Sequence, residues 1–265
     1  MNKPVIANPW QSLRQFTAAR IALGRAGVSQ PTDPQLAFQL AHARARDAVL
    51  LALDHAALAG KLAAACGLPC VSLHSAAESR QVYLQRPDLG RRLDEASRQA
   101  LAALPSPAEQ YDIAFVIADG LSALAIEQNA LPFLQALTAR LEPGQWRIAP
   151  LAIVRQGRVA IGDEVAHLLQ ARAVVVLIGE RPGLSSPDSM GLYLTWAPQP
   201  GLTDASRNCI SNVRPAGLTC EAAAFKLHYL LSESRKRQQS GIALKDETAA
   251  DSAAMEAPQR NFLLE

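Results

Sequence analysis

The feature of this sequence that most limits its possible folds is a set of short apolar runs, separated by segments with helical patterning. The runs are Asp112–Ala118 (DIAFVIA), Arg147–Val154 and Ala173–Ile178 (AVVVLI), and Leu192–Trp196 is a candidate for a fourth. A half-exposed strand alternates apolar and polar residues, whereas a strand that is buried on both faces does not. These runs therefore predict a parallel sheet whose two faces are covered by helices.

Helical patterning fills the gaps between the runs. One helical stretch reaches Leu141, in two pieces if Pro132 begins the second, and others are expected at Asp163–Gln170 and from Thr219 to Arg237. The expected fold class is therefore α/β, with a Rossmann-like three-layer, parallel-sheet domain over residues 75–243.

Residues 1–74 are expected to form a small all-helical N-terminal domain in front of the sheet. Apolar residues recur at helical spacing in Trp10–Leu23 and again in Asp33–Leu53. Asp47 falls within the apolar stripe of the second helix, where a carboxylate needs a partner. Its partner is either an arginine of the same bundle or a group across a subunit boundary. Residues 244–265 are expected to be a flexible tail.

Composition and charge exclude several classes of protein. The 265 residues are 49% hydrophobic and carry 26 basic and 24 acidic groups, for a net charge of +2. This composition allows a sizeable core and gives no basic footprint for nucleic acid. The sequence has no apolar run of about 18 residues and no signal-peptide core, so a cytoplasmic protein without membrane contact is expected.

The four cysteines are expected to be reduced thiols. Cys66 and Cys70 lie near His74, but a structural zinc site needs a further ligand. An incidental grouping is therefore favoured, and no metal site is expected.

Doubly wound sheets bind ligands beyond the carboxyl ends of their strands, and three segments occupy such positions here. The first, DGLS at 119–122, contains Asp119 and also suits an ordinary tight turn. The second, at Arg155–Ile161, offers the charge of Arg158 and the apolar side chain of Val159 to a flat ligand. No Gly-x-Gly-x-x-Gly motif follows any strand, which argues against a dinucleotide.

The third segment, Gly179–Gly191 (GERPGLSSPDSMG), is predicted to be a binding loop. Its two prolines and three glycines are more than a simple connection needs. Glu180 directly follows the strand, where its carboxylate can accept hydrogen bonds from ligand amides. The alternative is an ion pair with Arg181 or Arg158.

Cys209 lies among amide and hydroxyl side chains in Ala205–Asn212. It is a candidate nucleophile, but no histidine is near it in the sequence. A residue that lines a site is therefore the favoured interpretation.

Several of these segments together resemble the small subunit of ethanolamine ammonia-lyase. The resemblance extends from about Asn8 to Lys245, and GERPGL and R-x-C-I-S-N are its most specific parts. The other matching segments are RIALGRAG at 20–27, FQLAHARARDAV at 38–49, YLQRPDLGRRL at 83–93, DGLSALAI at 119–126, RVAIGDEVAHLL at 158–169 and the final helix.

The resemblance implies a subunit of an enzyme that converts ethanolamine to acetaldehyde and ammonia by radical chemistry with adenosylcobalamin. It implies a large TIM-barrel partner that holds the substrate, in a hetero-oligomer that is inactive without it. In the family, the small-subunit positions assigned to the cofactor match Val159, Glu180 and Cys209, and no catalytic residue is expected in this chain. An Asp-x-His-x-x-Gly motif is absent, which implies that dimethylbenzimidazole remains the lower cobalt ligand.

Two other functions are compatible with the same pattern: a non-catalytic cobalamin-binding or scaffold protein, and a nucleotide-dependent oxidoreductase. Some members of the family have an extended N-terminus that directs them to a bacterial microcompartment. About seven residues precede Asn8 here, so the cytoplasm is the expected location and a microcompartment is the alternative.

Overall fold

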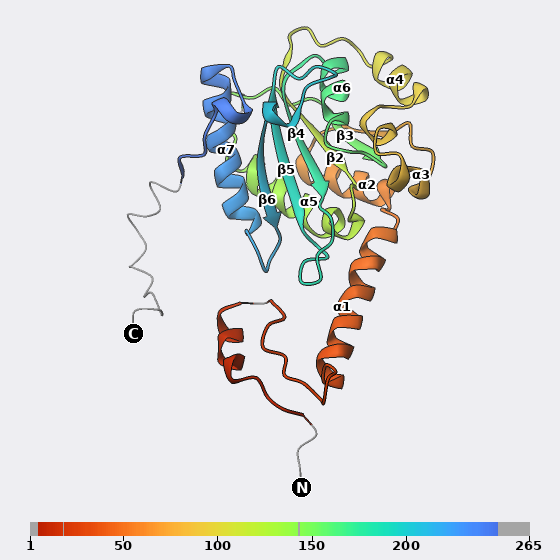
Figure 1. Cartoon of the computed structure of the whole chain (residues 1–265). Helices are drawn as coiled ribbons and strands as arrows, with labels where there is room; N and C mark the ends of the chain where they lie inside the picture. The colour runs from red at the N-terminus through yellow and green to blue at the C-terminus, as the bar shows by residue number, and fades with distance from the viewer. Residues whose placement is uncertain (1–4, 18, 143, 249–265) are drawn as a thin grey trace.

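The computed structural model describes residues 5–17, 19–142 and 144–248, and its centre is a six-stranded sheet (Figure 1). The strand order is β1-β3-β2-β4-β5-β6. The strands are β1 (Cys70–His74), β2 (Tyr111–Ala118), β3 (Leu151–Arg155), β4 (Ala171–Gly179), β5 (Met190–Trp196) and β6 (Arg207–Val213).

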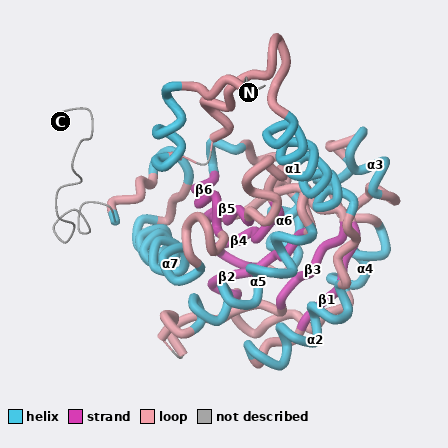
Figure 2. Tube along the Cα trace, turned by 90° about the horizontal axis from the view of Figure 1, so that it is seen from below, coloured by secondary structure: helices cyan, strands magenta, loops and turns pink. Residues whose placement is uncertain are grey.

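Helices cover both faces of the sheet, as the uninterrupted apolar strands require. Helices α2 (His55–Cys66), α5 (Ala123–Thr138) and α7 (Cys220–Arg237) cover one face (Figure 2). Helices α4 (Glu95–Ala102) and α6 (Ile161–Leu168) pack on the other, near the short helix α3 (Arg80–Gln85). The chain therefore forms an α/β structure in three layers.

The sheet is mixed, so the prediction of a parallel sheet was wrong for its last two strands. β1, β3, β2 and β4 are parallel, whereas β5 pairs antiparallel with β4 and β6 pairs antiparallel with β5. The reason is the length of the connections. Only residues 180–189 join β4 to β5, and a parallel crossover needs a dozen or more residues, usually with a helix.

The apolar segments of the sequence were located correctly, and two strands were missed. β2, β3, β4 and β5 overlap the four predicted runs. β6 was read as a polar loop because, as an edge strand, it exposes part of its sequence RNCISNV to solvent. β1 was assigned to the helical segment, but it pairs with β3 at the other edge.

Helix α5 continues through Pro132, so the prediction of two helical pieces was wrong. Its apolar side chains Phe133, Leu134 and Leu137 are fully buried against the sheet. This packing stabilises the helix, although Pro132 cannot donate a backbone hydrogen bond. The predicted cap at Thr219 is confirmed: its side chain accepts a hydrogen bond from Ala222 N at the start of α7.

The N-terminal segment differs most from its prediction. A 3-10 helix, η1 (Pro9–Phe16), replaces most of the expected first helix, and α1 (Thr32–Leu50) is the second. α1 extends away from the sheet (Figure 1) and buries only Ala41 and Ala48. The described part of this segment therefore has no core of its own.

Asp47 is not buried, contrary to our interpretation of the α1 stripe. Its side chain is 72% exposed and lies 3.8 Å from Arg46. The stripe residues Leu36, Leu40 and Leu50 are also exposed. The stripe was expected to face a core, but its leucines are exposed within the described chain.

Three further 3-10 helices lie in the body: η2 (Leu89–Arg91), η3 (Asp204–Ser206) and η4 (Gly241–Ala243). The first residues of the expected tail, 244–248, pack against α7. Leu244 is buried, and Lys226 Nζ lies 2.9 Å from Asp246 Oδ2. Residues 249–265 of that expected tail lie outside the described residues.

Within the described residues, no single helix has the length and apolar composition needed to cross a bilayer. Only α1 and α2 taken together meet the criterion, and they are bent by 80° at their junction.

Candidate functional site

The DGLS turn after β2 ties together the ends of three parallel strands. Leu121 N donates to Gly179 O at the end of β4 (2.9 Å), and Gly157 N, beyond β3, donates to Asp119 Oδ1 (3.3 Å). Gly120 has φ +58°, and a Cβ there would lie 2.3 Å from Gly179 O. Burial raises the pKa of Asp119. The turn is therefore structural and sets the positions of the neighbouring loops.

The predicted binding loop, 180–189, is held in one conformation by hydrogen bonds from several elements. Ser122, the N-cap of α5, donates from Oγ to Pro187 O (2.7 Å), and Asn129 Nδ2 donates to Asp188 O (2.9 Å). Arg214 Nη1 donates to Ser185 O (2.9 Å). The loop is thus fixed before any ligand binds.

Glu180 has one oxygen bonded within the chain and one available to a ligand. Its Oε2 accepts from Ser189 Oγ (2.5 Å) and from Asn212 N (3.2 Å). Among the described residues, no donor bonds to Oε1 and no ion pair involves Glu180. The alternative pairing with Arg181 or Arg158 is therefore wrong.

The neighbouring β5 position leaves room for the Glu180 carboxylate. A Cβ at Gly191 would lie 2.9 Å from Glu180 Oε1, so a side chain there would displace the acid. The sequence indicated an irregular loop here but did not reveal the role of this glycine.

Cys209 lies beside Tyr193, its register partner across the β5–β6 pair. Burial raises the pKa of the Cys209 thiol; the Tyr193 hydroxyl opposes this effect, and the nearby charge of Glu180 adds to it. A protonated thiol is a poor nucleophile, which favours the lining interpretation. Tyr193 was missed because it lies in an otherwise apolar strand.

These side chains lie on a part of the sheet that α6 leaves open. α6 packs on β2 and β4, whereas Cys209 on β6 is exposed and Tyr193 on β5 is half-buried. Burial raises the pKa of Tyr193, and the neighbouring Cys209 and Glu180 add to this effect. Glu180 and Cys209 thus share one neighbourhood, but Cys209 lies within β6 on the face of the sheet and not in a loop at the strand ends.

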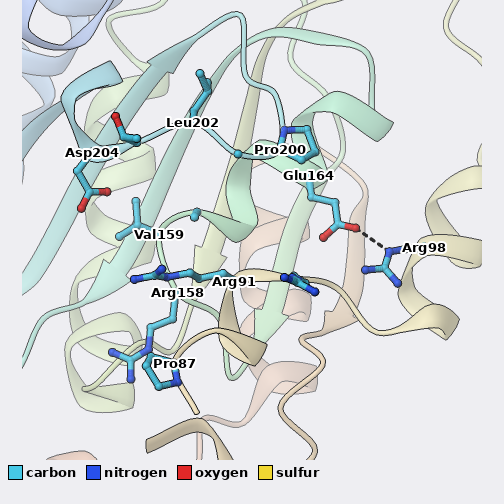
Figure 3. Close-up of a pocket in the computed structure, with 13 residues that line it drawn as sticks. Pro87, Arg91, Arg98, Arg158, Val159, Glu164, Pro200, Leu202 and Asp204 are labelled. Carbon is cyan, nitrogen blue, oxygen red and sulfur yellow. Dashed lines mark hydrogen bonds and ion pairs between the residues drawn. The ribbon is translucent and has the colours of Figure 1, made fainter.

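Val159 lies at the turn into α6, in a cavity of about 830 Å³ next to this open face (Figure 3). Val159 and Tyr193 pack against the same apolar cluster, which places them on the same face of the sheet. Arg158 points instead to Tyr83: its guanidinium lies 4.2 Å from the ring centroid, and Nη2 donates to Tyr83 O (3.2 Å). The three predicted residues therefore border one continuous side of the sheet.

A buried ion pair that the sequence did not reveal fixes α6 against β6. Arg207 Nη1 and Nη2 donate to the two carboxylate oxygens of Asp163, both at 2.7 Å, and Nη1 also donates to Thr195 Oγ1 (3.0 Å). Asp163 and Arg207 are almost completely buried. This pair joins the element that carries Val159 to the strand that carries Cys209.

In the part of the chain that the structure describes, no group of three or more histidine, cysteine, aspartate or glutamate side chains is arranged to hold a metal ion. Cys66, Cys70, Cys209 and Cys220 are free thiols.

Comparison with known proteins gives a consistent result over almost the whole chain. The family model described as "Ethanolamine ammonia-lyase light chain" matches residues 7–245. A protein of Ralstonia nicotianae named "Ethanolamine ammonia-lyase small subunit" is 59% identical over 265 residues, which cover 98% of this chain and 96% of the relative.

Relatives from other bacteria have the same name. One from Pseudomonas aeruginosa is 58% identical over 259 residues, which cover 97% of this chain and 94% of the relative. One from Pseudomonas putida is 56% identical over 268 residues, which cover 98% and 97%. With this coverage and identity, the chain belongs to the ethanolamine ammonia-lyase light-chain family.

Proposed function

We propose that this chain is the small subunit of an ethanolamine ammonia-lyase, a carbon–nitrogen lyase, and that it forms one wall of an adenosylcobalamin site. The observation that carries this proposal is the open face at Glu180, Tyr193 and Cys209, in a chain whose relatives described above are named as small subunits of that enzyme. The reacting groups belong to a large TIM-barrel partner in a hetero-oligomer, and this chain acts by binding.

The residues at the open face fit the periphery of a corrin. Cobalamin carries amide groups around a broad flat ring, and Glu180 Oε1 is an acceptor without a donor among the described residues. Ser189 and Asn212 hold the other oxygen, so the free one has a fixed direction. Tyr193 and Val159 supply apolar surface beside it.

Bound adenosylcobalamin supplies the radical by cobalt–carbon homolysis. The role of this chain is to hold the cofactor's edge and to keep water from one side of the site. Glu180 orients an amide and transfers no proton, and Cys209 stays a thiol. The sequence has no Asp-x-His-x-x-Gly segment, which supports dimethylbenzimidazole as the retained lower ligand.

We further infer an intracellular location, because the four cysteines are free thiols, as a reducing compartment maintains them. The cytoplasm and the lumen of a bacterial microcompartment both meet this condition.

The test is to co-express the chain with its large subunit and to measure acetaldehyde formation and cobalamin affinity. Loss of one hydrogen bond to a charged group weakens the binding free energy by about 1.5–3 kcal/mol. Glu180→Gln should therefore weaken cobalamin binding by about tenfold to a hundredfold, with kcat retained at saturating cofactor. Val159→Asp should also weaken binding, because it places a charge against the flat ligand.

Glu221→Gln is the matched control, since it removes an exposed carboxylate at the start of α7. It should leave the affinity unchanged. Wild-type affinity in Glu180→Gln and Val159→Asp would refute the site. Activity of this chain alone with a nicotinamide cofactor would favour the oxidoreductase alternative, and cobalamin binding without lyase activity in the complex would favour the scaffold.

A further inference from the structure

The cavity beside Val159 has a charged wall that the proposed role of Val159 does not explain. Four arginines line it, Arg91, Arg92, Arg98 and Arg158, together with only two carboxylates, Glu164 and Asp204. Arginine is the side chain best suited to hold phosphate, because its planar fork matches the geometry of the phosphate oxygens.

The two carboxylates are already bonded to other groups. Glu164 Oε1 accepts from Arg98 Nε (2.6 Å, the dashed line in Figure 3), and Oε2 accepts from Leu93 N (2.8 Å). Asp204 points to solvent and lies 3.4 Å from Arg207. Neither carboxylate neutralises Arg91 or Arg92, which form no ion pair within the described residues.

The arginine wall is built into the fold. Gly90 is buried, and a Cβ there would lie 2.9 Å from Arg158 Cγ and 3.0 Å from the Tyr83 ring. Arg158 N donates to Gly90 O (2.7 Å), so the η2 turn is locked against the loop that carries Val159. Arg158 Nε is also buried without a hydrogen-bond partner in the described chain.

The rest of the cavity is apolar and larger than a single phosphate requires. Pro87, Val159, Pro200 and Leu202 contribute to its lining. A volume of about 830 Å³ lies within the usual range for sites that hold organic ligands. The cavity thus has room for a phosphodiester with an organic group attached to it.

We propose that this cavity is an anion subsite for the phosphodiester of the cofactor's nucleotide tail, with Arg91 and Arg92 as the phosphate ligands. The inference rests on the proposed function, because the tail can reach the cavity only if the corrin lies on the adjoining open face. Val159 then separates the two parts of the site and contacts the ligand between them.

The test compares two corrinoids in the complex with the large subunit: cyanocobalamin, and cyanocobinamide, which lacks the phosphate, ribose and base. Equilibrium binding is measured for the wild type and for Arg91→Gln/Arg92→Gln. The double variant should lose about tenfold or more in cobalamin affinity, with a weaker salt dependence, and keep its cobinamide affinity. Lys236→Gln/Arg237→Gln, at the end of α7 on the opposite face of the sheet (Figure 2), removes the same charge and should change neither affinity.

Equal losses for both corrinoids, or no loss for either, would overturn the subsite and leave the proposed function standing. Failure of the double variant and of both single variants to assemble would also overturn it, because the arginines would then bind the partner subunit. A wild-type complex that binds neither corrinoid would refute the proposed function, and the subsite with it.

Discussion

Single residues at the site are positioned by neighbours that the sequence did not single out. Glu180 was expected to face a ligand, but its direction depends on Ser189 and Asn212, which bond one of its oxygens. By sequence, Asp119 suited a site and a turn equally, and the hydrogen bond that it accepts from Gly157 N makes it part of the scaffold. The type of residue was readable in the sequence, whereas its partners were not.

A second buried group at this scale is His55, at the start of α2. It is 7% exposed, and its Nε2 has no hydrogen-bond partner in the described chain. Burial, reinforced by the charge of Arg155, lowers the pKa of His55 from 6.5 to about 4. The folded protein therefore favours neutral His55, and this contribution is present above pH 6.5 and is lost as the pH falls towards 4.

We predict that the wild-type chain loses about 2 kcal/mol more unfolding free energy between pH 7 and pH 5 than His55→Leu does. Urea denaturation at the two pH values measures the difference. His42→Leu, at an exposed position on α1, should keep the wild-type pH dependence. The same pH dependence in His55→Leu and in the wild type would show that His55 titrates normally.

At the scale of elements, apolar strands were predictable and polar ones were not. A strand in the middle of the sheet must be apolar on both faces, so β2 and β4 were evident from composition. β6 pairs on one side only and exposes Cys209, so its sequence resembles that of a loop. The direction of β5 depends on the short connection before it, and the length of a connection is not part of an apolar pattern.

The Asp163–Arg207 pair should contribute strongly to the packing of α6 against β6. We predict that Arg207→Met lowers the unfolding free energy by about 3–5 kcal/mol, because it leaves the Asp163 carboxylate buried without its partner. Urea unfolding measures the cost, and the double variant Asp163→Leu/Arg207→Met should recover much of it.

The exposed pair Arg86–Asp88 provides the comparison, with an N–O distance of 2.7 Å, the same as in the buried pair. Arg86→Met should lower the unfolding free energy far less than Arg207→Met does, because solvent screens both charges. If the two single variants cost the same, burial would not be the source of the effect.

At the scale of the whole molecule, the chain consists of a packed body and an N-terminal arm. α2 packs on α5 within the body, whereas α1 and the 3-10 helix η1 extend from it (Figure 1). α2, which the sequence analysis placed in the N-terminal helical region, thus packs with the body. A helix needs a partner for its apolar stripe, and in the described residues α1 has almost none.

This division predicts that a Leu→Ala substitution lowers the unfolding free energy by different amounts in α2 and in α1. Leu62→Ala in α2, where Leu62 is fully buried, should cost about 2–5 kcal/mol. Leu40→Ala in α1, where Leu40 is 53% exposed, should change the unfolding free energy by less than about 0.5 kcal/mol. Urea unfolding of both variants tests this, and a large loss in Leu40→Ala would mean that the isolated chain covers the stripe.

The α/β class and the positions of the buried central strands were predictable from the sequence alone. These properties follow from local apolar patterning and from residue types, which a single chain displays directly. The tertiary structure alone decided the antiparallel edge of the sheet, the exposure of Asp47 and the arginine wall beside Val159. Each of these depends on which distant segments cover or contact one another, and no local pattern records that.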